Sequence, residues 1–268
     1  MSDKQHPELI VEREGYVGTL KLNRPERKNA LSLDLLVKLH QVLEDWKQSG
    51  EVRAAVITSA DDRAFSSGFD ILSIPTEMTP EMAELLKQHN PLELALSTVK
   101  NFPYPTIAML NGYAFGAGLN LAINCDIRIA ADDIRLGMPP AKLGLIYHPE
   151  GLRQFVEVLG MPRTREVFFS GRTYQGAQLV EMGLVDHLVS RAELWNVTYS
   201  LAREIADNAP LCLKGTKRIL NMLSEGLRLS DEKLREAETL INEAFNSDDL
   251  KEGQAAFLQK RKPRFVGK

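Results

Sequence analysis

Apolar residues recur along the chain in two patterns, one typical of buried strands and one typical of amphipathic helices. Three short, largely apolar runs predict strands, and the first of them is continuously apolar, as expected of a strand that is buried on both faces. These runs are residues 54–58, 106–110 and 127–130. Residues 9–11 and 17–22 predict a hairpin that turns at Glu14-Gly15. Strands and helices alternate up to about residue 188, which indicates an α/β core with crossover connections.

The helical pattern is clearest after Ser32, a residue type that often caps a helix N-terminus. One apolar face follows it, and Gly50 provides a C-terminal stop. The face consists of Leu35, Leu36, Leu39, Val42, Leu43 and Trp46. Shorter helices are expected at 119–124 and behind Thr79-Pro80-Glu81.

From Ala192 onward only helical patterns occur, at 194–208, 210–224, 230–246 and 247–262. We therefore expect a core of residues 1–191 and a C-terminal helical region of residues 192–268. Because no further sheet follows for these helices to cover, the helical region is expected to pack as a layer or to reach a neighbouring subunit.

Two glycine-bearing turns interrupt this pattern, Ser66-Ser67-Gly68-Phe69-Asp70 and Asn111-Gly112-Tyr113-Ala114-Phe115-Gly116-Ala117-Gly118. Small residues at such turns let a ligand approach backbone N–H groups that have no helical partner. Two of these donors aimed at one carbonyl oxygen make an oxyanion hole, and a helix dipole would support the second. The same glycines also suit tight turns and close helix–strand packing.

Composition limits the class of protein. The 268 residues carry a net charge of −3, which gives no general attraction for nucleic acid. The start of the chain is polar, and no run reaches the roughly 18 apolar residues of a membrane span. Cys125 and Cys212 lie far apart, which argues against a disulfide scaffold or a cysteine metal site. We expect a cytoplasmic globular protein with no nucleic-acid or membrane partner.

The two glycine motifs, with Asn23-Arg24-Pro25 before them and Cys125-Asp126 after them, resemble the crotonase family of enoyl-CoA hydratases and isomerases. The resemblance extends from Asn23 to Phe265. It implies a spiral of ββα units with a C-terminal helical appendage, assembled as a homotrimer or a dimer of trimers. It also implies an acyl-CoA thioester substrate whose enolate is held by the backbone amides of Phe69 and Ala117. Ala117 replaces a common glycine, so its methyl group would narrow the acyl pocket slightly.

The resemblance also implies where coenzyme A, as part of the substrate, would lie. The expected contacts come from the loop after the first hairpin and from the two glycine turns. They are Arg27, Lys28, Ala30, Ser67, Gly68, Phe69, Asp70, Ile71 and Gly116. Phe257 and Lys260 would reach a neighbouring subunit's coenzyme A. If the resemblance is set aside, the charges of residues 24–28 indicate only a solvent-exposed loop. No permanently bound cofactor and no metal are implied.

Hydratases of the family use two glutamates, and at those positions this chain has Asn120 and Pro140. Asn120 can hold a water or a carboxylate by hydrogen bonds but cannot accept a proton, and Pro140 has no side-chain chemistry. Hydration by the family mechanism and single-glutamate isomerisation are therefore both disfavoured.

Decarboxylation of a malonyl-type thioester produces the same enolate without a base. The segment from Pro139 to Tyr147 resembles methylmalonyl-CoA decarboxylases, with Tyr147 available to orient the carboxylate or protonate the enolate. The histidine of that branch is replaced by Phe69, and its acidic residue by Asn120.

The leading hypothesis is therefore an enzyme of the decarboxylase type or an isomerase with a relocated base, for which His148 and Glu150, in the loop just beyond Tyr147, are the candidates. Two alternatives remain at this point. In one, His148 or Glu150 acts as the relocated base of a hydratase or hydrolase. In the other, the chain is a non-catalytic trimer that binds coenzyme A esters.

Overall fold

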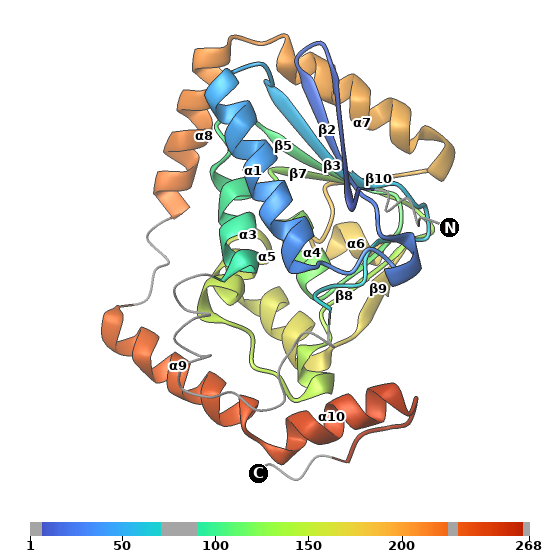
Figure 1. Ribbon diagram of the computed structural model, residues 1–268, viewed down its shortest axis with the longest axis vertical. Coiled ribbons are helices and arrows are strands. Elements are labelled where there is room, and N and C mark those ends of the chain that lie inside the picture. Colours follow the sequence, from blue (N-terminus) through green and yellow to red (C-terminus); the bar gives the residue numbers. More distant parts are fainter. Residues whose placement is uncertain (1–6, 71–89, 225–229, 265–268) are drawn as a thin grey trace, which may run out of the picture.

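Repeated strand–strand–helix units build the core of the protein (Figure 1). The computed structural model describes residues 7–70, 90–224 and 230–264. The first unit is β3 (Ala54–Ser59), β4 (Ala64–Ser66) and α3 (Pro91–Asn101), and the second is β5 (Thr106–Leu110), β6 (Tyr113–Phe115) and α4 (Ala117–Ile123). The third is β7 (Ile127–Ala131), β8 (Arg135–Gly137), the 3₁₀ turn η3 (Pro140–Leu143) and α5 (Pro149–Ser170).

Each unit contributes its two strands to two different sheets. The first strands join β1 (Leu9–Glu14), β2 (Val17–Leu22) and β10 (His187–Val189) in a sheet of order β1-β2-β3-β5-β7-β10. Only β1 and β2 pair antiparallel there. The second strands form the sheet β4-β6-β8-β9, in which β9 (Thr173–Gln175) is antiparallel to β8. This arrangement confirms the α/β spiral of ββα units.

Helices cover both faces of the larger sheet. Trp46, on α1 (Leu33–Ser49), lies against Gly18 of β2, where an added Cβ would come within 2.6 Å of its ring. The next residue of β2, Thr19, makes a 2.8 Å hydrogen bond to the hydroxyl of Tyr199, on α7 (Arg191–Ala206). Since successive strand residues point to opposite faces, α1 and α7 lie on opposite sides of the sheet.

The expected helix behind Ser32 is confirmed as α1. The Ser32 hydroxyl accepts a hydrogen bond from the Leu35 N–H, and Gly50 ends the helix with φ 67°. All six residues of the predicted apolar face are buried.

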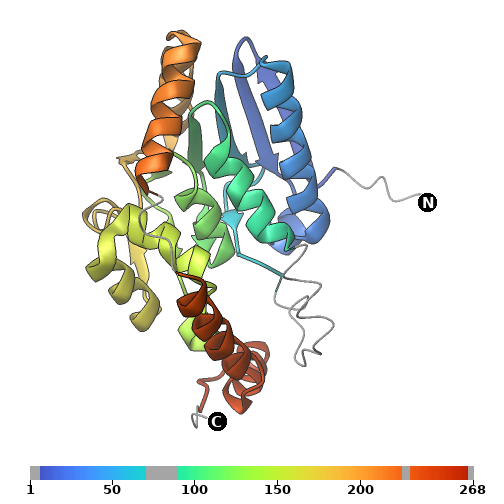
Figure 2. The same cartoon turned by 90° about the vertical axis from the view of Figure 1, so that its left-hand side faces the viewer.

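In the part of the chain that the structure describes, every element after β10 is a helix. After α7 come α8 (Pro210–Ser224), α9 (Asp231–Phe245) and α10 (Asp248–Leu258). Figures 1 and 2 show α9 and α10 at one end of the molecule, away from the larger sheet. There α10 packs on η3, so closely that a Cβ on Gly253 would lie 2.5 Å from the Leu143 carbonyl oxygen. The division at residues 191 and 192 stays a prediction.

The smaller sheet was not predicted, because each of its four strands is only three residues long and shows no periodicity. As a result, the second glycine motif is not one turn but contains the strand β6. The helix expected behind Thr79 lies outside the described residues. None of the helices in the described ranges combines the length and hydropathy needed to cross a bilayer.

Candidate active site

The two glycine turns meet at the carboxyl ends of the short parallel strands. Gly68 follows β4 and has φ 104°, and Gly116 follows β6 and has φ 54°. A Cβ on Gly68 would lie 2.8 Å from the Phe115 carbonyl oxygen and 3.5 Å from the Ala117 amide nitrogen. The first turn therefore lies directly against the start of α4, and only glycine fits at Gly68.

The backbone amides of Phe69 and Ala117 lie where these two turns meet, and in the part of the chain that the structure describes both are free to donate a hydrogen bond to a ligand. No described residue accepts a hydrogen bond from either N–H. Ala117 is the first residue of α4, where an N–H has no acceptor within the helix, and its φ is not positive. Ala117 is buried and Phe69 is half-buried. The structure thus brings the two predicted donors close together, and this pair of backbone amides is called the niche below.

The loop expected to contact coenzyme A runs beside this niche. The Ser67 N–H donates to the Lys28 carbonyl at 3.0 Å, and the Leu31 N–H donates to the Gly68 carbonyl at 2.8 Å. Lys28 and its neighbour Asn29 both have positive φ, so the loop makes a tight left-handed turn.

Asn29 was not singled out from the sequence, yet it fixes that turn. Its side chain is fully buried, accepts from the Arg24 N–H at 2.7 Å and donates to the Ala64 carbonyl at 2.7 Å. Asparagine is one of the few residues that readily adopts positive φ, which was the available signal.

The other predicted coenzyme A residues have different surroundings. Arg27 and Lys28 are exposed, Ala30 is buried, and Asp70 is half-buried. Ile71 lies outside the described residues. Phe257 and Lys260 are exposed at the end of α10 and in the turn after it.

Asn120 and Tyr147 lie together beyond the niche. Asn120 is one helical turn along α4 and is 1% exposed. The Tyr147 ring centroid lies 5.5 Å from that of Phe168. The Tyr147 hydroxyl is buried and has no hydrogen-bond partner among the described residues. Burial raises the pKa of this phenol above its usual range, and the nearby Asn120 side chain opposes the rise only in part.

Pro140, which opens η3, is also buried. Asn120 and Pro140, the positions at which the resemblance predicts the hydratase glutamates, thus carry no titratable group.

The sequence predicted a loop at His148 and Glu150, and this prediction is wrong. His148 is the N-cap of α5 and Glu150 is in its first turn. The difference arises because Pro149 at the first helical position is compatible with a helix. The His148 Nδ1 lies 2.8 Å from Glu93 Oε1, on α3, and 3.4 Å from the Glu150 amide nitrogen. One nitrogen cannot donate to the first and accept from the second, and the shorter contact is the stronger.

These two groups have opposite electrostatic surroundings. The hydrogen bond to Glu93 raises the pKa of His148, against the opposing effect of burial. Burial of Glu150 would raise its pKa, but the bonds and charge of Arg153 outweigh this and lower it. Arg153 Nε donates to Glu150 at 2.9 Å. Glu150 is therefore a weak base, whereas His148 retains its proton to higher pH.

Residues 12–268, nearly the whole chain, match the model of a protein family described as Enoyl-CoA hydratase/isomerase. The chain belongs to this family. Its fold and its glycine motifs place it in the crotonase superfamily.

Individual relatives differ in the reaction for which they are named. The short-chain-enoyl-CoA hydratase of Clostridium acetobutylicum is 31% identical over 95% of both chains. The mitochondrial methylglutaconyl-CoA hydratase of Mus musculus is 30% identical, over 97% of this chain and 82% of its own. Among solved structures, a methylmalonyl-CoA decarboxylase bound to 2-nitronate-propionyl-CoA has a TM-score of 0.90 at 27% identity, covering 98% of this chain and 100% of that one.

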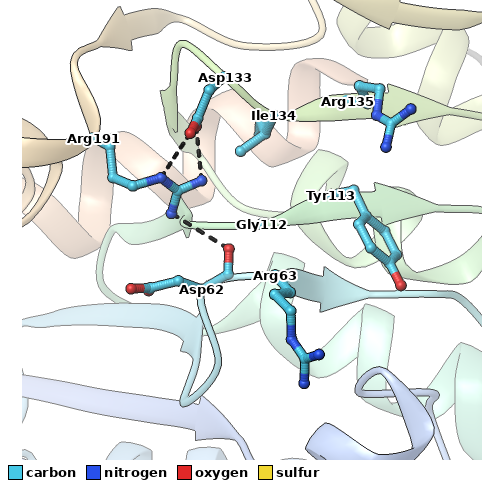
Figure 3. Close-up of a pocket in the computed structure, with 8 residues that line it drawn as sticks. All are labelled: Asp62, Arg63, Gly112, Tyr113, Asp133, Ile134, Arg135 and Arg191. Atoms are coloured by element: carbon cyan, nitrogen blue, oxygen red, sulfur yellow. Dashed lines mark hydrogen bonds and ion pairs between the residues drawn. The ribbon is translucent and has the colours of Figure 1, made fainter.

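A separate cavity of about 460 Å³ lies at the opposite end of the small sheet (Figure 3). Arg63 immediately precedes β4, while Tyr113 and Arg135 begin β6 and β8. Arg191 crosses this cavity and binds both carboxylate oxygens of Asp133, at 2.7 and 2.8 Å. Ligands of α/β sheets bind at the carboxyl ends of the strands, where the glycine turns lie, whereas this cavity lies at the other end.

Among the described residues, no group of three histidine, cysteine, aspartate or glutamate side chains is placed to hold a metal ion. Asp126 accepts hydrogen bonds from the amide and hydroxyl of Thr106 and pairs with Lys217 at 2.6 Å, which is a structural role.

Proposed function

We propose that this chain decarboxylates a malonyl-type acyl-CoA thioester through an enolate held by the amides of Phe69 and Ala117. The strongest support for this proposal is the set of chemical groups around the two amides. A two-amide niche adjoins Asn120 and the buried hydroxyl of Tyr147, which has no partner in the part of the chain that the structure describes, and neither glutamate position has a base. The likeness to a methylmalonyl-CoA decarboxylase structure also supports the proposal.

In the proposed reaction the bond between the α-carbon and the carboxylate breaks, and carbon dioxide leaves. The electron pair passes to the thioester oxygen, where each of the two amide donors stabilises the negative charge by a few kcal/mol. The α-carbon then takes up one proton. Before the bond breaks, the Tyr147 hydroxyl and the Asn120 amide donate hydrogen bonds to the substrate carboxylate.

Substrate recognition in this proposal starts at the loop beside the niche. Arg27 and Lys28 bind the phosphates of coenzyme A, and the backbone near Ala30 and Ser67 approaches the adenine and the pantetheine arm. Coenzyme A enters and leaves with the acyl group, so it is substrate and not a resident cofactor.

A second function is favoured by one specific contact, the ion pair between His148 and Glu93. A histidine held by a carboxylate can take and return a proton, as isomerisation or hydration with a relocated base requires. Glu150 is less suited to this role because Arg153 lowers its pKa.

The test is a set of coenzyme A thioesters assayed with the purified protein. Malonyl-CoA and methylmalonyl-CoA report carbon dioxide release, crotonyl-CoA reports hydration, and a β,γ-enoyl-CoA reports double-bond migration. Release of carbon dioxide alone is expected. Double-bond migration or hydration that is lost in His148→Gln would favour the second function. Binding of all the thioesters without turnover would favour a non-catalytic binding protein.

A further inference from the structure

Gly151, in the first turn of α5, lies directly against the ring of Tyr147. A Cβ at this position would lie 2.4 Å from Tyr147 Cε1 and 2.6 Å from Cδ1. It would also lie 3.5 Å from Asn120 Nδ2, which is an ordinary contact. Carbon atoms do not approach within 3 Å without a shift, so the ring occupies its place only because residue 151 has no side chain.

The backbone at Gly151 does not itself require glycine. Its φ is not positive, and alanine is the better helix former by about 1 kcal/mol. Within the described part of the chain, the contact with Tyr147 is therefore the feature that accounts for glycine at this position.

The Tyr147 ring also packs against an aromatic cluster. Phe168 lies at a centroid distance of 5.5 Å, and Phe168 itself packs edge-on against Phe155 at 5.0 Å. Gly151 and this aromatic cluster together fix the position of the ring. That position buries the hydroxyl near Asn120, with no hydrogen-bond partner among the described residues.

We infer that Gly151 is a positioning residue, which fixes the Tyr147 hydroxyl beside Asn120 as a recognition site for the carboxylate of the substrate. The inference rests on the proposed function. A carboxylate only accepts hydrogen bonds, and the phenol hydroxyl and the carboxamide NH₂ can both donate to it. A buried hydroxyl without a partner is costly in the free protein, and a bound carboxylate removes that cost.

A double-mutant cycle tests this coupling. Gly151→Ala and Tyr147→Phe should each lower kcat/KM for methylmalonyl-CoA decarboxylation by about 10- to 100-fold, the range for a lost hydrogen bond to a charged group. The double variant should be no worse than Tyr147→Phe, because the alanine acts only through the hydroxyl. Affinity for propionyl-CoA, which lacks the carboxylate, should stay within about twofold. Additive losses, or wild-type activity in Gly151→Ala, would overturn the inference.

Gly18→Ala is the matched control. Its Cβ would meet the Trp46 ring at 2.6 Å, a similar glycine–aromatic clash outside the site. This variant should lose stability while its folded fraction keeps the wild-type kcat/KM. If it also lost decarboxylation, the loss in Gly151→Ala would reflect general destabilisation, and the inference would fail.

Two readouts do not depend on turnover. Calorimetric affinity for a propionyl-CoA that carries a nitronate at C2 should fall in Gly151→Ala and in Tyr147→Phe. If the wild type binds this anion but releases no carbon dioxide, the proposed function fails while the positioning role stands. A crystal structure of Gly151→Ala should show the Tyr147 ring displaced, and an unmoved ring would refute the positioning role whatever the reaction.

Discussion

His148 Nδ1 and Glu93 Oε1 lie 2.8 Å apart, an ion pair that joins the N-cap of α5 to the first turn of α3. The pair crosses between two ββα units. Both side chains are partly exposed, so the contact is screened and its effect on stability is modest.

Glu93→Gln should lower the pKa of His148. The glutamate raises that pKa in the folded protein, while burial, Glu150 and Glu238 also act on it. A raised histidine pKa stabilises the fold below the unfolded pKa of about 6.5 and loses this effect as the pH rises through the folded pKa. The wild type should therefore be more stable than Glu93→Gln by about 0.2–1 kcal/mol at pH 5.5, and equal to it at pH 8.5.

NMR titration of His148 in both proteins measures the shift, and denaturant unfolding at the two pH values measures its consequence. A stability difference that grows with pH would contradict the assignment.

Gly68→Ala should reduce acyl-CoA binding far more than Gly116→Ala. Both positions have positive φ, which costs a substituted residue about 1–3 kcal/mol. At Gly68 the new Cβ also collides, 2.8 Å from the Phe115 carbonyl oxygen, whereas at Gly116 no atom of the described residues other than its chain neighbours lies within 4 Å. Calorimetry with acetyl-CoA gives the comparison, and circular dichroism shows whether each variant folds. Equal affinities would mean that the thioester binds elsewhere.

Tyr147→Phe should separate stability from activity. The substitution removes a buried hydroxyl that has no described partner, so the free energy of unfolding should stay the same or rise by about 1 kcal/mol. Decarboxylation should nevertheless fall. A variant that is destabilised by more than about 2 kcal/mol would show that the hydroxyl has a structural partner in the free protein.

Assembly is the fourth expectation. Leu211, Leu220 and Leu223 of α8 are 84%, 59% and 75% exposed in the single chain, an apolar surface that association would cover. We predict a trimer or a dimer of trimers in which Phe257 and Lys260 approach a neighbour's coenzyme A. Light scattering should give three or six chain masses at micromolar concentration, and a monomer would contradict the prediction.

The sequence was most informative where the determining interactions are local. The cap at Ser32 and the apolar face of α1 depend on neighbours within a few residues, and both are confirmed. The two glycine motifs were also recognisable, because tight backbone geometry restricts the residue types allowed there.

The features that could not be predicted from the sequence depend on contacts between residues that are far apart in the chain. Glu93 lies 55 positions before His148, and no local pattern connects them. Gly151 was overlooked because a glycine near a helix start has many explanations, and its contact with Tyr147 shows only in three dimensions. The short strands of the small sheet gain their order from pairing with one another and not from their own sequence.

The most direct measurement of the central claim uses methylmalonyl-CoA labelled with ¹³C in its free carboxyl group, followed by NMR in D₂O with the purified wild type. We predict that the label leaves as carbon dioxide and bicarbonate, while propionyl-CoA accumulates with one deuterium on its α-carbon. Crotonyl-CoA in a parallel sample should stay unhydrated, because losing a positioned acid or base costs about 10²–10⁴-fold and neither glutamate position has one. An intact labelled thioester together with rapid formation of 3-hydroxybutyryl-CoA would contradict the account.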